Sequence, residues 1–183
     1  SSGIGRGIAV TCSKMGANIV LGGRNEARLK ETLSEMEGEG HVLAVADLTK
    51  KEELEKMVDT LPKLDGIVHC AGIGQRILCK QLLETDVDNV MDLNFKAPVL
   101  LQTEILKKKK INKGASIVFI ASIAAESPSV GNSIYSASKG AIISYANCLV
   151  VELAPRKIRV NCISPAMVWT DLILKDGISE EEL

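Results

Sequence analysis

The chain has 183 residues, of which 46% are apolar and 25% are charged. This length and apolar content suit one domain with a sizeable core. The 22 basic and 23 acidic residues leave a formal net charge of −1, which argues against a strongly basic nucleic-acid-binding protein. We therefore expect no nucleic acid as a partner. We also expect no membrane partner, because no apolar run approaches the length of a bilayer span.

The five cysteines are odd in number, and no two of them have CxxC spacing. Such usage indicates reduced thiols in an intracellular protein rather than disulfides or a zinc site. With only two histidines in the chain, we expect no metal, and we expect a cytoplasmic protein.

Helical and strand-like segments alternate along the chain. Apolar stripes at helical spacing predict helices over residues 4–15, 29–36, 49–61, 86–109 and 133–153. Short apolar runs predict strands over residues 18–21, 41–46, 65–70, 115–120 and 158–163. Asn25 and Thr49 are the predicted N-caps of two of the helices, and Thr49 opens a capping-box sequence with Glu52.

Strands that alternate with helices of ten or more residues imply right-handed βαβ units and a parallel sheet. The strands are near-continuous apolar runs, as in a sheet that helices cover on both faces. The sequence therefore predicts an α/β fold with three layers. The one block of like charge, residues 107–110, has four lysines at a helix end. We interpret it as a solvated helix terminus rather than a phosphate-binding patch.

Gly3, Gly5 and Gly7 stand at the start of the first helical stripe. Glycines there let the backbone turn tightly and let a phosphate approach the helix N-terminus, whose free N–H groups favour anions. Ordinary turn chemistry also places glycines at helix starts. The helix, the next strand and its terminal loop follow in the order that a dinucleotide site requires.

Arg24 follows that next strand, where many NAD sites have an acidic residue that binds the ribose 2′-hydroxyl. A guanidinium at this place favours a 2′-phosphate, so the sequence favours NADP(H), with NAD(H) still possible. In the alternative interpretation, Arg24 is a solvated residue before a helix.

Tyr135 and Lys139 are four residues apart and would share one face of a helix. A nearby ammonium lowers the pKa of a tyrosine hydroxyl from about 10 and makes it a usable proton donor. Ser122 ends a buried strand upstream, at the strand end where ligands of open α/β sheets bind. A surface contact and a strand-terminating hydroxyl are the alternatives, which the combination of three residues makes weaker.

Asn94 lies inside the predicted helix over residues 86–109, four residues before Pro98. Because proline lacks an N–H, the carbonyl of Asn94 loses its helical partner. This predicts a kink with a carbonyl that could hold a water. A helix that bends only for packing is the alternative.

Together these residues resemble the short-chain dehydrogenase/reductase family over essentially the whole chain. Residues 1–5 are similar to the end of its TGxxxGxG motif, and Asn94, Ser122, Tyr135 and Lys139 have the order and spacing of its catalytic tetrad. The resemblance implies a Rossmann-like doubly wound sheet in a single domain over residues 1–183. It also implies that the family's first and last strands, and the true N-terminus, lie outside these residues.

Three more segments match the family's cofactor site. Asp47-Leu48 matches its adenine contact, Cys70-Ala71-Gly72 stands where Asn-Ala-Gly is usual, and residues 164–170 resemble the Pro-Gly motif beside the nicotinamide. Cys70 thus replaces an amide that supports the central strands, and Ala166 replaces a glycine. The implied cofactor-binding set is Ser1, Ser2, Gly3, Ile4, Gly5, Arg24, Asp47, Leu48, Cys70, Ala71, Gly72, Tyr135, Lys139, Pro165, Val168 and Thr170.

The resemblance implies hydride transfer between NADP(H) and a carbonyl or secondary alcohol, without a metal. Tyr135 would exchange the proton, Ser122 would hydrogen-bond the reacting oxygen, and Lys139 would bind the ribose and assist Tyr135. Asn94 would link Lys139 to solvent through a water held by its backbone. A non-catalytic dinucleotide-binding protein on the same fold is an alternative, against which the intact tetrad argues.

A 3-oxoacyl thioester, which an acyl carrier protein could carry, is the first choice of substrate, and a sugar, steroid or xenobiotic carbonyl is the alternative. Candidates for the substrate wall, which could instead line the core, are Ile123, Ala124, Val130, Met167, Trp169 and Leu172. The resemblance also implies a homodimer or homotetramer formed through the helices of Asn94 and Tyr135. The apolar positions Ala141, Tyr145 and Leu149 suit either that interface or the core.

Overall fold

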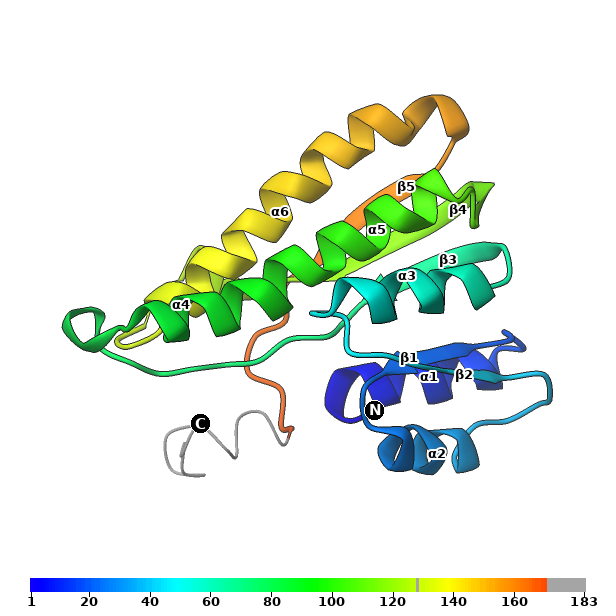
Figure 1. Ribbon diagram of the computed structural model, residues 1–183, viewed down its shortest axis with the longest axis horizontal. Helices are drawn as coiled ribbons and strands as arrows, with labels where there is room; N and C mark the ends of the chain where they lie inside the picture. Colours follow the sequence, from blue (N-terminus) through cyan, green and yellow to red (C-terminus); the bar gives the residue numbers. More distant parts are fainter. Residues whose placement is uncertain (128, 171–183) are drawn as a thin grey trace.

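The computed structural model describes residues 1–127 and 129–170, and the strands of this part pair in parallel in two groups. β1 (Val20–Gly23) pairs with β2 (Val42–Val45). β4 (Ile111–Ile120) lies between β3 (Leu64–His69) and β5 (Arg159–Ile163). Figure 1 shows α1 and α2 beside the first group, while α5 and α6 run along the second. The parallel pairing agrees with the predicted βαβ units.

Helices connect the strands. Their bounds are α1 (Gly3–Lys14), α2 (Glu26–Ser34), α3 (Lys51–Thr60), α4 (Glu84–Met91), α5 (Ala97–Lys107) and α6 (Ser133–Leu153). A π-helical turn, η2 (Asp92–Lys96), joins α4 to α5, and short 3₁₀ turns occur at η1 (Cys79–Gln81), η3 (Ile123–Ala125) and η4 (Ala154–Arg156). In the described residues no helix is both long and apolar enough to span a bilayer.

The alternation of side chains along β1 places helices on both of its faces. Leu21 is buried against Ala9 of α1 and Leu29 of α2. Its neighbour Val20 packs on the opposite side, against the larger core cluster that contains Leu54 of α3. Three layers, as the apolar strands predicted, are therefore present around β1 and β2.

The larger core lies between the β3–β4–β5 sheet and its helices. Ile117 and Phe119 of β4 are buried there with Ile105 of α5 and Ile142 of α6. The other face of this sheet is more open in the described residues, since Val68 and Ile163 are exposed.

Two helix starts differ in how they are capped. Asn25 caps α2 as predicted, because its side-chain oxygen accepts from the N–H of Arg28 at 3.0 Å. The predicted cap at Thr49 is wrong, since α3 begins after Lys50. The N–H and hydroxyl of Thr49 instead donate to the carboxylate of Asp47, at 3.0 and 2.7 Å. The Thr49 hydroxyl is therefore used in a short-range turn with Asp47 and does not cap the helix, as the capping box would require.

The long helix predicted over residues 86–109 is divided by the π-helical turn. The N–H of Ala97 bonds the carbonyl of Asp92, five residues back. Pro98 follows directly and cannot donate the next helical bond. The predicted interruption at Asn94 is therefore present, in the form of a wider turn that often marks functional sites.

Candidate active site

The predicted site segments meet at the carboxyl ends of the strands. A Cβ placed on Gly3 would lie 3.2 Å from the Thr170 methyl carbon, so the start of α1 touches the segment after β5. That segment also reaches the end of β4, because the Ile123 N–H donates to the Pro165 carbonyl at 3.1 Å. Residues from both ends of the described chain thus share one edge of the fold.

The glycine-rich start of α1 borders a cavity of about 330 Å³. Gly3 has a φ of +49°, which favours glycine, and Ser2 before it is extended and makes no side-chain cap. The N–H groups of the first helical turn are donors for an anion here. The cavity is lined by Ser1, Ser2, Gly3, Arg6, Arg28 and Glu31.

Two arginines of this cavity were missed by sequence reasoning. Arg6 forms ion pairs with Glu31 and Glu35 of α2 at 2.9 and 3.1 Å, so it joins α1 to α2. Arg28 is half-buried and forms no ion pair among the described residues. Its place in the first turn after the predicted N-cap was the available signal, because residues there lie at the strand's carboxyl end.

Arg24 and Asp47 follow the neighbouring strands β1 and β2, and Arg24 is exposed. The pKa of the Asp47 carboxyl is lowered, first by the hydrogen bonds from Thr49 and then, more weakly, by the Arg24 cation. A cation and a fixed carboxylate therefore flank the place predicted for the adenosine ribose.

Asn94 uses its side chain rather than its carbonyl in the contacts that the structure describes. Its Oδ1 accepts from the Ile73 N–H at 2.8 Å, and its Nδ2 donates to the Ile73 carbonyl at 2.9 Å and to Ser138 Oγ at 3.1 Å. The buried amide thereby joins the loop after β3 to α6. A Cβ on Gly72 would lie 3.1 Å from Asn94 Oδ1 and 3.5 Å from Lys139 Nζ, so these side chains converge on Gly72 and leave little room for a larger residue.

Lys139 is buried, and its Nζ donates to the Ile120 carbonyl at 2.8 Å. The same Nζ lies 5.6 Å from the ring centroid of Tyr135. Burial lowers the pKa of Lys139, an effect that the nearby Cys70 thiol opposes, and burial raises the pKa of that thiol. Cys70 also lies near the glycine-rich start, because a Cβ on Gly5 would be 3.3 Å from its sulfur.

Ser122 caps the 3₁₀ turn η3, since its Oγ accepts from the Ala124 N–H at 3.1 Å. This turn packs on α6, the helix of Tyr135, and both side chains are half-buried. Ser138 was missed by sequence reasoning. Its hydroxyl donates to the Tyr135 carbonyl at 2.7 Å and accepts from Asn94. A serine directly before Lys139, on the face of an otherwise apolar helix, was the available signal.

Most of the candidate substrate-wall residues are exposed and do not line the core. Ile123, Val130, Met167 and Trp169 have exposed fractions between 46% and 82%. Ala124 is half-buried, and Leu172 lies outside the described residues. Of the remaining cofactor candidates, Ile4, Leu48 and Pro165 are half-buried, and Ala71 and Val168 are exposed.

A sequence profile described as short chain dehydrogenase matches residues 1–180. The chain belongs to the short-chain dehydrogenase family. Its class is therefore a nicotinamide-dependent oxidoreductase on a Rossmann fold, as the sequence predicted.

Among its relatives, a 3-oxoacyl-[acyl-carrier-protein] reductase, FabG, of Rickettsia felis is 34% identical over all of this chain and 74% of its own length. Human dehydrogenase/reductase SDR family member 4 is also 34% identical, over all of this chain and 69% of its own length. A 3-ketoacyl-(acyl-carrier-protein) reductase of Brucella melitensis, solved in complex with NADH, is similar with a TM-score of 0.86 and 27% identity, covering 94% of this chain and 75% of that one. A dehydrogenase/reductase of Sinorhizobium meliloti 1021 has a TM-score of 0.88 and 31% identity, over 99% and 73% of the two chains.

Proposed function

We propose that this protein reduces the carbonyl of a 3-oxoacyl thioester with NADP(H), and that Asn94, Ser122, Tyr135 and Lys139 form its active site. The observation that carries the proposal is the buried Lys139 ammonium, held between the Ile120 carbonyl and the Tyr135 ring. A fixed cation beside a tyrosine suits proton donation to a developing alkoxide.

The residues at the strand ends fit a dinucleotide. The cavity at the start of α1 offers backbone N–H donors and the side chain of Arg28, which suit a diphosphate. Ser1, Ser2, Gly3, Ile4 and Gly5 would hold that group, and Arg24 would pair with a 2′-phosphate. Asp47 and Leu48 would flank the adenine, and the remaining contacts are Cys70, Ala71, Gly72, Pro165, Val168 and Thr170. The cofactor, when bound, supplies the hydride.

The chain's own residues then handle the proton and the charge. Tyr135 donates its hydroxyl proton to the substrate oxygen, and Ser122 hydrogen-bonds the same oxygen as charge develops on it. Lys139 stabilises the phenolate that remains on Tyr135. The Asn94–Ser138 hydrogen bond holds the first turns of α6 in place, so Asn94 acts as a positioning residue.

Two observations support the substrate assignment. Apolar side chains near Ser122 are exposed to solvent, and several relatives are described as reductases of 3-oxoacyl groups. Ile123, Met167 and Trp169 are exposed beside the site, and they would offer contact to an acyl chain. The relatives include reductases of 3-oxoacyl groups on an acyl carrier protein, and we propose the same kind of carrier-linked substrate here. The same apolar surface would also accept a steroid or xenobiotic carbonyl.

Replacing Tyr135 tests the mechanism directly. We expect Tyr135→Phe to lower kcat on 3-oxoacyl thioesters by a factor of about 10² to 10⁴, as for loss of a general acid, while NADPH affinity stays near that of the native protein. NADPH oxidation gives the rate, and fluorescence titration gives the affinity. Tyr145→Phe is a matched control, because Tyr145 is the only other tyrosine. Unchanged turnover in Tyr135→Phe would contradict the mechanism.

A substrate panel separates the proposed substrate from its alternatives. Acyl thioesters, sugars, steroids and xenobiotic carbonyls are compared by kcat/KM for NADPH oxidation. The proposal expects the highest kcat/KM for the thioesters. A higher value for another carbonyl class would replace the substrate while leaving the role of Tyr135 intact.

We also propose a cytoplasmic homodimer or homotetramer. All five cysteines are free thiols, as a reducing compartment favours. Tyr145 packs edge-on to Phe119 and Leu149 is buried, so both contribute to the core. Ala141 is half-buried. The apolar side chains that α5 and α6 leave exposed, Leu100, Val150 and Val151, are the better support for an interface.

A further inference from the structure

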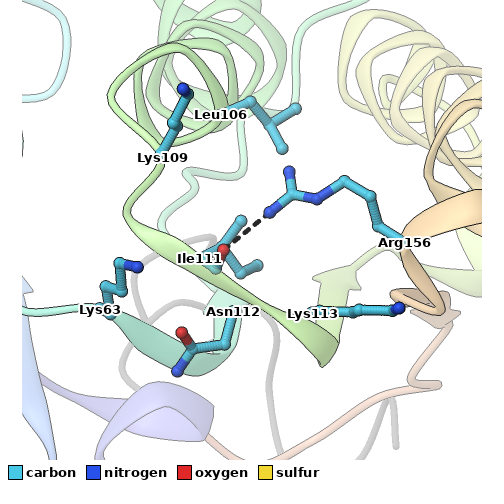
Figure 2. A pocket seen from close by; sticks show the side chains of 7 residues that line it. All are labelled: Lys63, Leu106, Lys109, Ile111, Asn112, Lys113 and Arg156. Carbon is cyan, nitrogen blue, oxygen red and sulfur yellow. Dashed lines mark hydrogen bonds between the residues drawn. The ribbon is translucent and has the colours of Figure 1, made fainter.

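A second cavity lies at the opposite end of the strands from the candidate active site. It measures about 460 Å³ and lies where α5 ends, β4 begins and the η4 turn follows α6. The candidate active site is at the carboxyl ends of the strands, whereas this cavity is at their amino ends. Figure 2 shows its lining residues, which are Lys63, Leu106, Lys109, Ile111, Asn112, Lys113 and Arg156.

An irregularity in β4 shapes this cavity. Leu64 of β3 pairs with Ile111, but Gly66, only two residues later, pairs with Ser116. Residues 112–115 therefore form a bulge, and a bulge re-aims the side chains that it carries. The side chain of Arg156, from the η4 turn, is anchored to β4, because its Nη2 donates to the Ile111 carbonyl at 2.8 Å.

The charge of the lining is entirely positive. Its four cations are Lys63, Lys109, Lys113 and Arg156, and no acidic residue lines the cavity. None of the four forms an ion pair with an acidic side chain in residues 1–127 and 129–170. Asp65, which does not line the cavity, accepts from the Asn112 amide at 2.8 Å. Four cations around one hollow repel one another, so an anion between them is favourable.

The four lysines at 107–110 differ in their partners. Lys107 pairs with Glu104, and Lys108 pairs with Asp59. Lys110 donates to two backbone carbonyls. Only Lys109, which has a φ of +55°, lines the cavity. Lys109 is exposed, as expected for a solvated terminus, and it is the member of the block that borders the cavity.

We propose that this cavity binds a small soluble anion that bears a diphosphate group, at a site separate from the cofactor. Its volume lies within the range of small-molecule sites. The planar fork of Arg156 keeps donors for phosphate oxygens beyond the one bonded to Ile111. The three lysines supply the charge to balance a multiply charged anion, and the Asn112 amide adds a neutral polar group to the same wall.

Calorimetric titration of the natural gene product with pyrophosphate tests this proposal. Saturating NADPH is present throughout, so that the diphosphate site at α1 is filled. We expect saturable binding that weakens as salt is raised. The double variant Lys63→Gln/Lys113→Gln should raise the Kd by about tenfold or more, since hydrogen bonds to charged groups are strong ones. Arg156 is left unchanged because its loss would also free the Ile111 carbonyl.

The matched control is Lys14→Gln/Lys56→Gln, which removes two exposed lysines of α1 and α3 and should leave the Kd unchanged. Thermal unfolding of each variant checks that the fold is retained. Absence of saturable pyrophosphate binding, or an equal Kd in the native protein and in Lys63→Gln/Lys113→Gln, would overturn the proposal. Capture only by vesicles with phosphorylated inositol lipid, and not by soluble diphosphate, would also overturn it.

Discussion

Asn94 connects three segments through one buried amide. It bonds both polar groups of the Ile73 backbone and the Ser138 hydroxyl, and Ser138 in turn bonds the Tyr135 carbonyl. A buried amide with all these partners fixes the geometry around it, because leaving any of them unpaired costs free energy. The positions of Tyr135 and Lys139 therefore depend on Asn94, which reaches their helix through Ser138.

Arg24 is the residue that we expect to determine the preference for NADPH over NADH. We expect the native protein to bind NADPH more tightly than NADH, and Arg24→Ala to lose about 1.5–3 kcal/mol of NADPH binding, the range for hydrogen bonds to charged groups. NADH affinity should change little. Fluorescence titration of both cofactors measures this. Arg159→Ala, at an exposed arginine of β5, is the matched control. A native protein that prefers NADH would refute the assignment.

Among the elements, the π-helical turn determines where Asn94 points. An uninterrupted α-helix advances by a constant angle per residue, and the wider turn at 92–96 changes the phase between α4 and α5. Pro98 prevents regular α-helical hydrogen bonding at this point, because it lacks the N–H that such a helix would use. Asn94 therefore makes its buried contacts from within the interruption.

The contact between β3, β4 and α5 contains a buried histidine that makes stability depend on pH. The His69 ring stacks on Phe119 with centroids 4.5 Å apart, and its Nε2 lies 2.9 Å from Gln102 Oε1. Burial lowers the pKa of His69 from 6.5 to about 4. The unfolded chain therefore binds this proton more readily than the folded protein does, between these two pH values.

We expect the free energy of unfolding to lose about 3 kcal/mol through His69 as pH falls from 6.5 to 4, with its full contribution above pH 6.5. Urea unfolding at several pH values measures this. In His69→Phe/Gln102→Leu the loss over this range should be smaller, because neither the histidine nor an unpaired amide remains. His41→Gln, at the other histidine, is the control and should keep the native slope. Parallel pH curves for native and double variant would contradict the prediction.

At the scale of the whole molecule, the fold leaves apolar side chains open on α6. Val151 is 75% exposed and Val150 is 44% exposed, near the end of that helix. Exposed apolar groups that lie together are a mark of protein interfaces. This face is separate from the open residues beside Ser122, so assembly and substrate binding need not compete.

We expect Val151→Asp to shift the protein towards the monomer, because a buried and unpaired carboxylate is costly in an interface. Sedimentation velocity over a range of concentrations measures the distribution. Val45→Asp, at an exposed valine of β2, is the matched control and should leave the assembly unchanged. A monomeric native protein, or an oligomer that Val151→Asp does not weaken, would refute the proposed interface.

Local chemistry determined much of this protein. The Asn25 cap, the apolar stripes of the helices and the interruption at Asn94 each depend on residues within a few positions of one another. Tyr135 and Lys139 share a helix face for the same reason, because helical geometry alone brings residues four apart together. The parallel α/β class followed from the alternation of such segments.

Tertiary structure decided what those residues contact. The Lys139 bond to Ile120 and the Asn94 bond to Ser138 span 19 and 44 residues. The hydroxyl of Thr49 turned to Asp47 instead of capping α3, and Lys109 alone of its block joined a cavity with Arg156. Local propensity is expressed over a few bonds of the chain. Contacts between distant segments depend on how buried faces pack, and a single sequence does not state that packing.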